Sequence, residues 1–477
     1  MLLSTTIVSG ADVKCYELLL KPPETDGVND TLKETVYQAI RTNPDVLASC
    51  QAFWAATRQQ DAARGGYLPT VDLTARAGYE GYRNNGLTSD YQPGQVSIGL
   101  NQMLYDGFIT RDEVARLGSE RRARFYELLE SFEGIALESV TAYLDVLRYR
   151  SLLAYAEENL RQHEEIYRQV EERVRVGVGR GVDLDQAKGR LALARANHRT
   201  EANNLHDVCC RYLRLVGELP ATALKPPSDL VYIHLPEKIE AALVEAFDNN
   251  PSVAAAFERT TAARDALKVR QDVYQPRLDL RAHHEVGEDR DRITGNSNET
   301  IVELVASFNL YRGGRDSSTI KQFTHLFNQS IDLRDKVCRN VRQELAIAMR
   351  DIEFLDLQLA YLKEHEMSSA KAREAYRNQF DIGQRTLLDL LDTENEYFEA
   401  RRAYTIASYD YVQSYARSAA NMGKLMTSLG LRSDDLGQLS FIGDRRDEYI
   451  MSQFCSAEGI PETLFQSGDV SPQPWLK

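Results

Sequence analysis

The stretch LYDG at residues 104–107 recurs as LYRG at residues 310–313, which is an offset of 206 positions. Upstream of these stretches, Asn-Pro occurs at residues 43–44 and again at residues 250–251, an offset of 207. Separate matching blocks that keep one order along the chain indicate an internal duplication. We therefore expect two copies of one structural unit of roughly 200 residues.

The duplication predicts how the 477 residues are organised. The expected segments are an N-terminal segment at 1–30, a first repeat at 31–219, a linker at 220–236, a second repeat at 237–430 and a tail at 431–477. Residues 1–10 are mildly apolar, but no Lys or Arg precedes them, so the charged region that opens a secretory signal is missing. We interpret the N-terminal segment as a signal remnant or a linker, with the true signal upstream or lost.

The composition excludes some classes of protein. The chain has 57 basic and 71 acidic residues, a net charge of −14. Affinity for nucleic acid depends on Lys and Arg that neutralise phosphates, so no nucleic-acid partner is expected. The mean hydropathy is −0.43 and no run of 18 apolar residues occurs, which argues against a transmembrane helix. Transmembrane strands stay possible because alternating strands give a weak hydropathy signal.

Each repeat has the pattern of an opening helix, a β hairpin, a long helix, a glycine turn and a return helix. The expected helices cover residues 31–65, 107–176 and 183–216 in the first repeat, and 236–274, 313–380 and 386–429 in the second. At 1.5 Å per residue, a helix of roughly 70 residues is about 100 Å long. Such a length predicts coiled-coil packing.

After Pro69 the hydrophobic period changes to two, which predicts strands. Val71 and Leu73 alternate with Asp72 and Thr74, and the second repeat has the same pattern. This alternation fits either a soluble sheet with one wet face or strands with one face toward lipid. Four strands cannot close a membrane barrel, and open sheet edges are not tolerated in lipid. If the strands cross a membrane, several chains must pool them in a cyclic homo-oligomer.

These features resemble the TolC family of outer-membrane channel proteins over about residues 31–430. The motifs that carry the resemblance are the two Asn-Pro pairs, YLP at 67–69, YQP at 274–276, LYDGF at 104–108 and GQRTLLDLLD at 383–392. The resemblance implies a mainly α fold with transmembrane β structure, in which duplicated units of long coiled-coil helices and a β hairpin form a homotrimer. The trimer would have a 12-stranded β-barrel in the lipid of the outer membrane, on an α-helical tunnel that extends into the periplasm.

The resemblance also implies partners. The duct would act with a periplasmic adaptor (membrane fusion) protein and an inner-membrane ABC transporter or other pump. Residues 100–117 and 173–217 look more like ducts of type I protein secretion, with adhesin or RTX-type cargo, than like multidrug ducts. The alternatives are the outer-membrane component of a multidrug efflux pump and, from another class, a soluble coiled-coil scaffold.

The second tip carries the candidate gate. Asp389 and Asp392 are three residues apart, so they share one helix face. Threefold symmetry would turn each into a ring of carboxylates, which favours cations at a constriction. The resemblance implies that the acids line the periplasmic aperture, with Asp183 as the acid of the first repeat, and that Arg385 holds the closed state through links between helices. Untwisting of periplasmic helices would open it. The resemblance places Phe380 where the family often has a tyrosine, so that hydroxyl is lost. The alternative is that these are capping and surface charges after a turn.

The two glycine turns are candidates for docking the adaptor protein. They contain Gly177, Val178 and Gly179 in the first repeat, and Gly383 and Gln384 in the second. The alternative is that they are plain helix-hairpin turns, where glycine supplies a positive φ.

The sequence predicts no catalytic residue, no cofactor and no metal site. It has no GxSxG, HExxH, Walker glycine loop or GxGxxG after a strand. Asp389 and Asp392 could imitate an acid/base pair, but an exposed helix offers them no pocket. His283 and His284 would lie on opposite faces of a strand, which is unsuited to chelating one metal ion. The six cysteines have no CxxC pair and no metal-ligand spacing.

Overall fold

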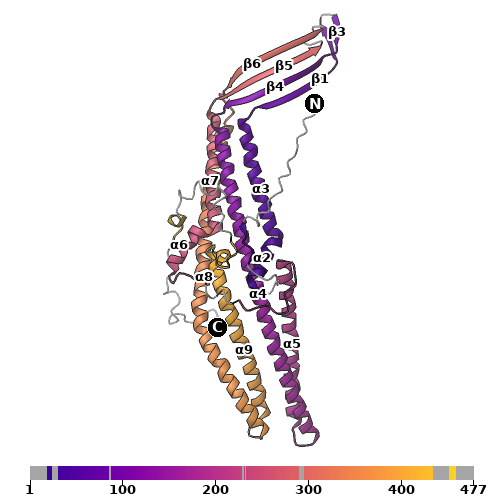
Figure 1. Cartoon of the computed structure of the whole chain (residues 1–477), viewed down its shortest axis with the longest axis vertical. Coiled ribbons are helices and arrows are strands. Elements are labelled where there is room, and N and C mark those ends of the chain that lie inside the picture. The colour runs from indigo at the N-terminus through magenta and orange to yellow at the C-terminus, as the bar shows by residue number, and fades with distance from the viewer. Residues whose placement is uncertain are drawn as a thin grey trace. The chain divides into compact units, whose positions relative to one another are not determined.

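The computed structural model describes residues 19–23, 31–84, 87–227, 230, 233–288, 295–432 and 451–457. The chain divides into two compact units, each of which takes segments from both repeats (Figure 1). The sheet unit comprises residues 51–126 and 255–336, and the helical unit comprises the described parts of 1–50, 127–254 and 337–477. The two longest helices, α4 (Ile109–Arg175) and α8 (Arg315–Asp381), have 67 residues each and contribute to both units.

The sheet unit contains a four-stranded antiparallel sheet in the order β1-β4-β5-β6 (Figure 1). Its strands are β1 (Thr70–Ala77), β4 (Gly94–Tyr105), β5 (Arg277–Glu288) and β6 (Asn296–Ser307). Between β1 and β4, where the sequence indicated only a turn-rich stretch, β2 (Glu80–Asn84) pairs with β3 (Leu87–Tyr91) as a second hairpin. Each repeat supplies one pair of neighbouring strands to the sheet.

The strand register places the apolar side chains on one face, as the alternation predicts. Leu100 lies opposite Ala282, which lies opposite Val302. The apolar face is open: Leu73 is 75% exposed and Val302 is 69% exposed. On the other face Asp279 is buried and accepts a hydrogen bond from Arg277 Nε at 2.8 Å. The sheet therefore has one apolar exposed face and one charged face.

His283 and His284 occupy successive positions of β5, so their side chains lie on opposite faces of the sheet, as expected. His284 Nδ1 lies 2.8 Å from Thr300 Oγ1 on the next strand. Among the described residues, no group of three or more His, Cys, Asp or Glu is placed to hold a metal ion.

Aromatic packing and an ion pair join three helices in the sheet unit. The rings of Phe53 on α3 (Pro44–Arg64) and Phe125 on α4 meet edge to face at 5.7 Å, and both side chains are buried. Arg122 on α4 lies 2.9 Å from Glu258 on α7 (Pro251–Gln271). The two repeats are thus joined to each other within the sheet unit.

The opening helix of each repeat is two helices, where the sequence analysis expected one. The helix α2 (Leu32–Thr42) ends at Asn43 before α3, and α6 (Ile239–Asn249) ends at Asn250 before α7. Each of these Asn residues precedes a proline, which disfavours the α conformation, and each has an extended ψ. The Asn43 side chain then accepts from Asp45 N at 2.8 Å and starts the next helix.

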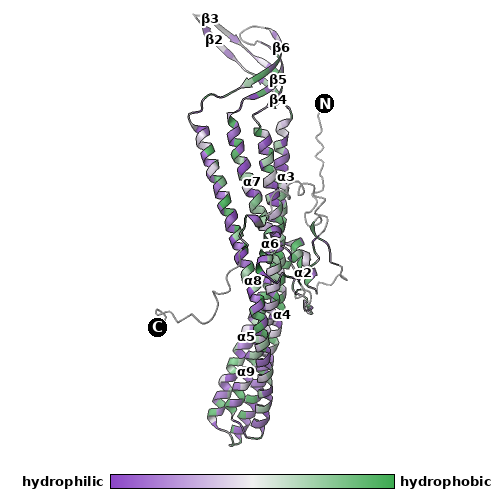
Figure 2. Cartoon of the chain, turned by 90° about the vertical axis from the view of Figure 1, so that its left-hand side faces the viewer, coloured by the Kyte–Doolittle hydropathy of each residue, from purple (hydrophilic) through white to green (hydrophobic). Residues whose placement is uncertain are grey.

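The helical unit consists mainly of two long hairpins. The first hairpin pairs α4 with α5 (Gly181–Val216), and the second pairs α8 with α9 (Leu387–Asn421). These bounds agree with the predicted helices, except that Gly423, with φ +66°, separates α10 (Leu425–Ser428) from α9. Hydrophobic and hydrophilic residues are interspersed along the helices (Figure 2). None of the described helices has the length and apolar composition needed to span a membrane.

A disulfide joins Cys338 on α8 to Cys455, just after the short helix η7 (Met451–Gln453). The helix η7 packs against α6, so the described part of the tail is held on the helical unit. The spacing of the cysteines gave no indication of this pair. Structural disulfides are typical of oxidising compartments such as the bacterial periplasm. A short helix proposed from the sequence at residues 444–450 lies outside the described residues.

A buried carboxyl group lies where α10 begins. Glu133 on α4 is 7% exposed, and it accepts hydrogen bonds from the backbone N–H groups of Leu425 at 3.1 Å and Met426 at 3.4 Å. Burial raises the pKa of Glu133 to about 7, although these N–H groups and Arg432 oppose the shift. The group therefore titrates near neutral pH when the chain is folded.

We predict that Glu133 makes the stability of the helical unit fall as pH rises from about 4.5 to about 7. In this interval the folded chain keeps a proton on Glu133 that the unfolded chain releases. The free energy of unfolding therefore falls with rising pH, by about 3 kcal/mol at most. Thermal unfolding in detergent between pH 4 and 8 measures the slope. Glu133→Gln should flatten it, and Glu130→Gln, at an exposed position of the same helix, should not. Equal slopes for the wild type and Glu133→Gln would contradict this assignment.

Candidate functional site

The second tip, between α8 and α9, is a glycine turn closed by backbone hydrogen bonds. Gly383 has φ +77°, and its N–H donates to Phe380 O at 3.0 Å. The N–H of Gln384 donates to Gln379 O at 2.8 Å. This is the Schellman arrangement, in which glycine takes the left-handed conformation after a helix. Gly383 and Gln384 thus have a structural role in the turn.

Asp389 is part of a capping box at the start of α9. Its N–H donates to Thr386 Oγ1 at 3.3 Å, while its Oδ2 accepts from the Thr386 N–H at 3.2 Å and from the Thr386 hydroxyl at 2.8 Å. The hydrogen bonds from the Thr386 hydroxyl and N–H, with a smaller effect of Arg385, hold the pKa of Asp389 below its usual value. Asp389 therefore caps the helix and remains charged.

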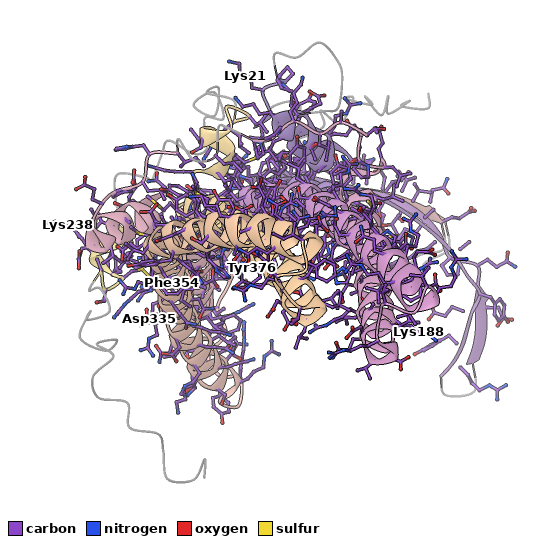
Figure 3. The ribbon with its side chains drawn as sticks, turned by 90° about the horizontal axis from the view of Figure 1, so that it is seen from below. Lys21, Lys188, Lys238, Asp335, Phe354 and Tyr376 are labelled. Atoms are coloured by element: carbon purple, nitrogen blue, oxygen red, sulfur yellow. A yellow bond between two sulfur atoms is a disulfide. The ribbon has the colours of Figure 1, made fainter. Side chains whose placement is uncertain are left out.

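Arg385 contacts an aromatic residue that the sequence analysis did not single out. Its guanidinium carbon lies 4.2 Å from the ring centroid of Tyr376 on α8, which Figure 3 labels. Its Nε donates to Gln379 Oε1 at 3.0 Å, and its Nη1 lies 3.9 Å from Asp389 Oδ2. Tyr376 is one helical turn before Phe380, so it faces the same side of α8 as Phe380, the position where the family often has a tyrosine.

Phe380 belongs to an apolar core between the two hairpins. It is 5% exposed and clusters with buried residues of four helices, and the Arg173 guanidinium lies 4.9 Å from its ring centroid. The other members of this tip core are Ile166, Val170, Ala187, Leu387, Leu390 and Leu391. A phenyl ring suits this position because no hydroxyl has to be satisfied there.

The two other acids of the predicted gate, Asp392 and Asp183, form no ion pair with Arg385. Asp392 Oδ1 lies 2.5 Å from Nη2 of Arg190 on α5, so its ion pair joins the second hairpin to the first. Asp183 lies at the start of α5 and its N–H donates to Arg180 O at 3.1 Å. The Asp183 side chain is half-buried and has no hydrogen-bond or ion-pair partner among the described residues. Neither Arg190 nor its pairing with Asp392 was predicted from the sequence.

The first tip, between α4 and α5, is also a glycine turn. Gly177 has φ +81°, and the N–H groups of Val178 and Gly179 both donate to Arg173 O. A Cβ on Gly179 would lie 2.9 Å from the backbone N of Val174, so this glycine is needed for space. Val178 is 78% exposed at the end of the hairpin. The first tip therefore presents an apolar side chain on a turn closed by backbone hydrogen bonds.

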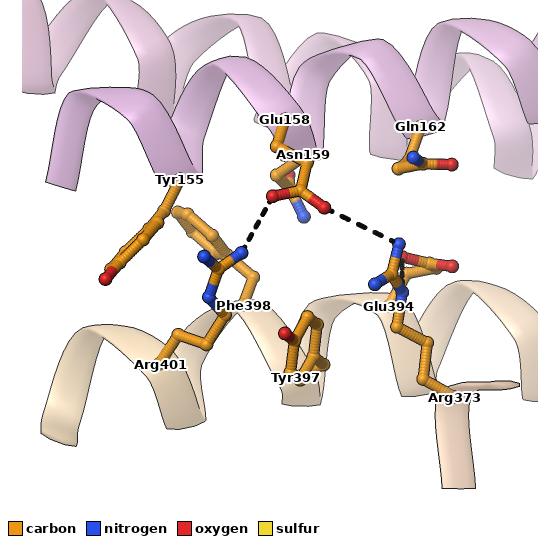
Figure 4. A pocket seen from close by; sticks show the side chains of 9 residues that line it. All are labelled: Tyr155, Glu158, Asn159, Gln162, Arg373, Glu394, Tyr397, Phe398 and Arg401. Atoms are coloured by element: carbon orange, nitrogen blue, oxygen red, sulfur yellow. Dashed lines mark hydrogen bonds and ion pairs between the residues drawn. The ribbon is translucent and has the colours of Figure 1, made fainter. Parts of the chain in front are cut away.

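Charged residues on α4, α8 and α9 connect the hairpins further from the tips (Figure 4). Glu158 accepts from Arg401 at 2.8 Å and lies 3.9 Å from Arg373. Arg373 Nε also lies 2.8 Å from Glu394, whose side chain is buried, and Arg401 stacks 3.9 Å from the Tyr155 ring centroid. The cavity that these residues line holds no more than about one water-sized volume. It is a network of ion pairs with no room for a ligand.

The comparisons with known proteins identify the family. The model of the family "Outer membrane efflux protein" matches residues 35–208 and 242–424, which is more than half of the chain. The chain belongs to this family, which includes the TolC proteins. The two matched segments correspond to the two repeats.

Several relatives match most of the chain. It is 27% identical over 411 residues to the outer membrane efflux protein BepC of Brucella suis biovar 1 (strain 1330), with 85% of this chain and 88% of BepC covered. It is 25% identical to the outer membrane protein TolC of Escherichia coli (strain K12), with 83% of each covered. It is 26% identical to the alkaline protease secretion protein AprF of Pseudomonas aeruginosa, with 81% and 83% covered.

Solved structures show the same fold. The outer membrane channel CmeC of Campylobacter jejuni superposes with a TM-score of 0.73 at 17% identity, covering 87% of this chain and 89% of CmeC. The protein is therefore an outer-membrane efflux channel of tripartite export systems, a passive conduit and not an enzyme. Channels of this family form trimers and act with periplasmic adaptor and inner-membrane pump partners. Family membership excludes the soluble coiled-coil scaffold.

We predict that Phe380→Ala loosens the two hairpins at their tips. Removing a buried phenyl group costs about 3–5 kcal/mol. Hydrogen exchange at the ends of α8 and α9 should become faster, and the thermal midpoint should fall. Leu388→Ala removes a side chain that is 47% exposed beside the same turn and serves as the control. If both variants exchange alike, Phe380 does not hold the hairpins together.

Proposed function

We propose that three copies of this chain form one continuous duct, with four strands from each chain in a 12-stranded barrel and with the helices forming a tunnel in the periplasm. One observation carries the proposal. In the described sheet β1 and β6 each pair on one side only, so both edges have free backbone N–H and C=O groups. Lipid cannot satisfy such groups, and the exposed apolar face of the sheet suits lipid. Joining β6 of one copy to β1 of the next would satisfy both edges.

An apolar stripe on α8 supports contact with a second copy. Ile347, Phe354 and Tyr361 are seven residues apart and lie 48%, 59% and 73% exposed (Figure 3 labels Phe354). Leu357, 68% exposed, lies on the same side. A seven-residue apolar repeat is the pattern by which helices pack in coiled coils. The trimers of the family make a second copy the expected occupant of this stripe.

We predict that Phe354→Glu prevents assembly. A carboxylate in a helix–helix interface loses its hydration without gaining a partner. The detergent-corrected mass of protein from outer membranes should change from about three times the 54.0 kDa chain to that of a single chain. Lys363→Glu, nine residues along α8 and so on the opposite side of the helix, is the control. A wild-type protein that is monomeric in outer membranes would contradict the trimeric duct.

The proposed aperture lies at the second tip. Asp389, Asp392, Arg385 and Asp183 would surround it in three copies, and Phe380 would support it from the tip core. Opening requires the hairpins to untwist, so the ion pairs between hairpins would have to rearrange. The charge that Asp389 retains supports its place in a ring that favours cations.

The tips are the proposed docking surface for the periplasmic adaptor. Gly177, Val178 and Gly179 form the surface at the first tip, and Gly383 and Gln384 form it at the second. The exposed side chains Val176, Val178, Val182 and Ile382 would give this surface an apolar centre. Apolar side chains on turns closed by backbone hydrogen bonds suit a protein partner because such turns lose little entropy on binding.

The proposed role of the duct is type I protein secretion, with an adhesin or RTX-type cargo. Residues 100–117 and 173–217 support this role, as does the likeness to a protease secretion protein over 81% of the chain. The alternative is the outer-membrane component of a multidrug efflux pump, which the likeness to BepC favours. The inner-membrane partner would be an ABC transporter in the first case and another type of pump in the second.

The two roles can be separated in a host that lacks its own ducts. We predict that the chain, given a functional export signal, releases an RTX-type reporter into the medium when it is expressed with a type I ABC transporter and adaptor. Expressed with a drug pump and its adaptor, it should not restore extrusion of a dye. The reverse pattern would establish the efflux alternative. The control is the assembly-deficient Phe354→Glu variant, which should support neither activity.

A further inference from the structure

We propose that Arg190 is a specificity-determining residue of the aperture: it pairs with Asp392 and cancels one of the two acid rings while the hairpins are in contact. This inference rests on the proposed channel function and adds a residue to it. Arg190 lies on α5 of the first hairpin, and Asp392 lies on α9 of the second. The effective charge at the tip then depends on a residue outside the turn that carries the acids.

The geometry of the pair supports a direct charge compensation. The Arg190 guanidinium donates a hydrogen bond from Nη2 to Asp392 Oδ1, and the two opposite charges are in direct contact. The side chains are 34% and 55% exposed, so water and ions reach both groups. A neutral substitution at Arg190 would therefore remove the positive charge beside the Asp392 carboxylate and change the charge at the aperture.

The two acids at the second tip differ in how they are compensated. Asp389 has its partners within its own hairpin, namely Thr386 and Arg385. Asp392 has its partner on the other hairpin. When the hairpins separate, Asp389 would keep its partners and Asp392 would lose Arg190. Separation of the hairpins would thus uncover one additional negative charge per chain.

Other contacts keep the hairpins together when Arg190 is replaced. The tip core around Phe380 includes residues of all four helices. On α8, Arg377 donates to Gln162 of α4 at 2.8 Å and lies 3.3 Å from Glu165. Because these contacts do not involve Arg190, its replacement should change the charge of the aperture without unfolding the helices.

The test is the ion selectivity of single channels in planar bilayers under a KCl gradient. In a trimer, Arg190→Gln removes three positive charges that are paired with the proposed Asp392 ring, so the K⁺/Cl⁻ permeability ratio should rise about threefold. Arg190→Lys should keep the wild-type ratio. Asp392→Asn should lower the ratio, and the double variant should lie near the wild type because both charges are absent.

Arg195→Gln is the matched control. Arg195 lies on the same helix, 62% exposed, and pairs with Glu164 at 3.4 Å, away from Asp392. A ratio for Arg190→Gln equal to that of Arg195→Gln, in channels that conduct, would overturn the role of Arg190 and leave the channel intact. A wild-type protein that forms no channel would overturn the proposed function, and this inference with it.

Discussion

The backbone groups along the outer edges of β1 and β6 set the main constraint on this structure. A four-stranded sheet cannot close on itself, and its open edges cannot remain in lipid. Pooling strands from several copies satisfies the edges, and it also brings the helices that continue from the strands around one axis. The exposed apolar stripe of α8 would then pack against a second copy of the chain. One requirement for hydrogen bonds thus accounts for the proposed assembly, its tunnel and the proposed rings of charge.

Much of the fold was predictable because it is periodic. Alternation along β5 and β6 gave both the strands and their two faces, and the absence of breakers gave α4 and α8 to within about two residues at each end. The breaks at Asn43 and Asn250 were not predicted. The helix-forming composition of residues 31–65 and 236–274 indicates one continuous helix in each repeat, but a proline disfavours the helical conformation of the residue before it. The Cys338–Cys455 pair joins residues 117 positions apart, and pairings over such distances leave no local pattern in one sequence.

The position of the candidate site was predictable from the sequence, but the partners of its side chains were predictable only in part. The turn glycines and the i, i+3 spacing of the acids follow from local rules, and the capping role of Asp389 was one of the two readings that the spacing allowed. Arg190, the partner of Asp392, and the residues of α4 and α5 that pack with Phe380 lie about 200 positions away in the sequence. Which face of α5 meets α9 depends on packing, so neither Arg190 nor the tip core could be read from spacing.

The two tips show how the repeats have diverged while keeping one topology. Both have a left-handed glycine after the long helix, so the turn itself is conserved between the repeats. The second return helix starts with the capping box of Thr386 and Asp389, while the first starts at Arg180 with no side-chain cap. The capping box holds the Asp389 carboxylate at the start of α9, which suits the proposed charge-selective aperture. The first tip has exposed valines and no such fixed charge, which suits an apolar contact with a partner. Both tips keep exposed apolar side chains, while the proposed aperture takes most of its acids from the second, and the Arg190–Asp392 pair couples the two hairpins electrostatically.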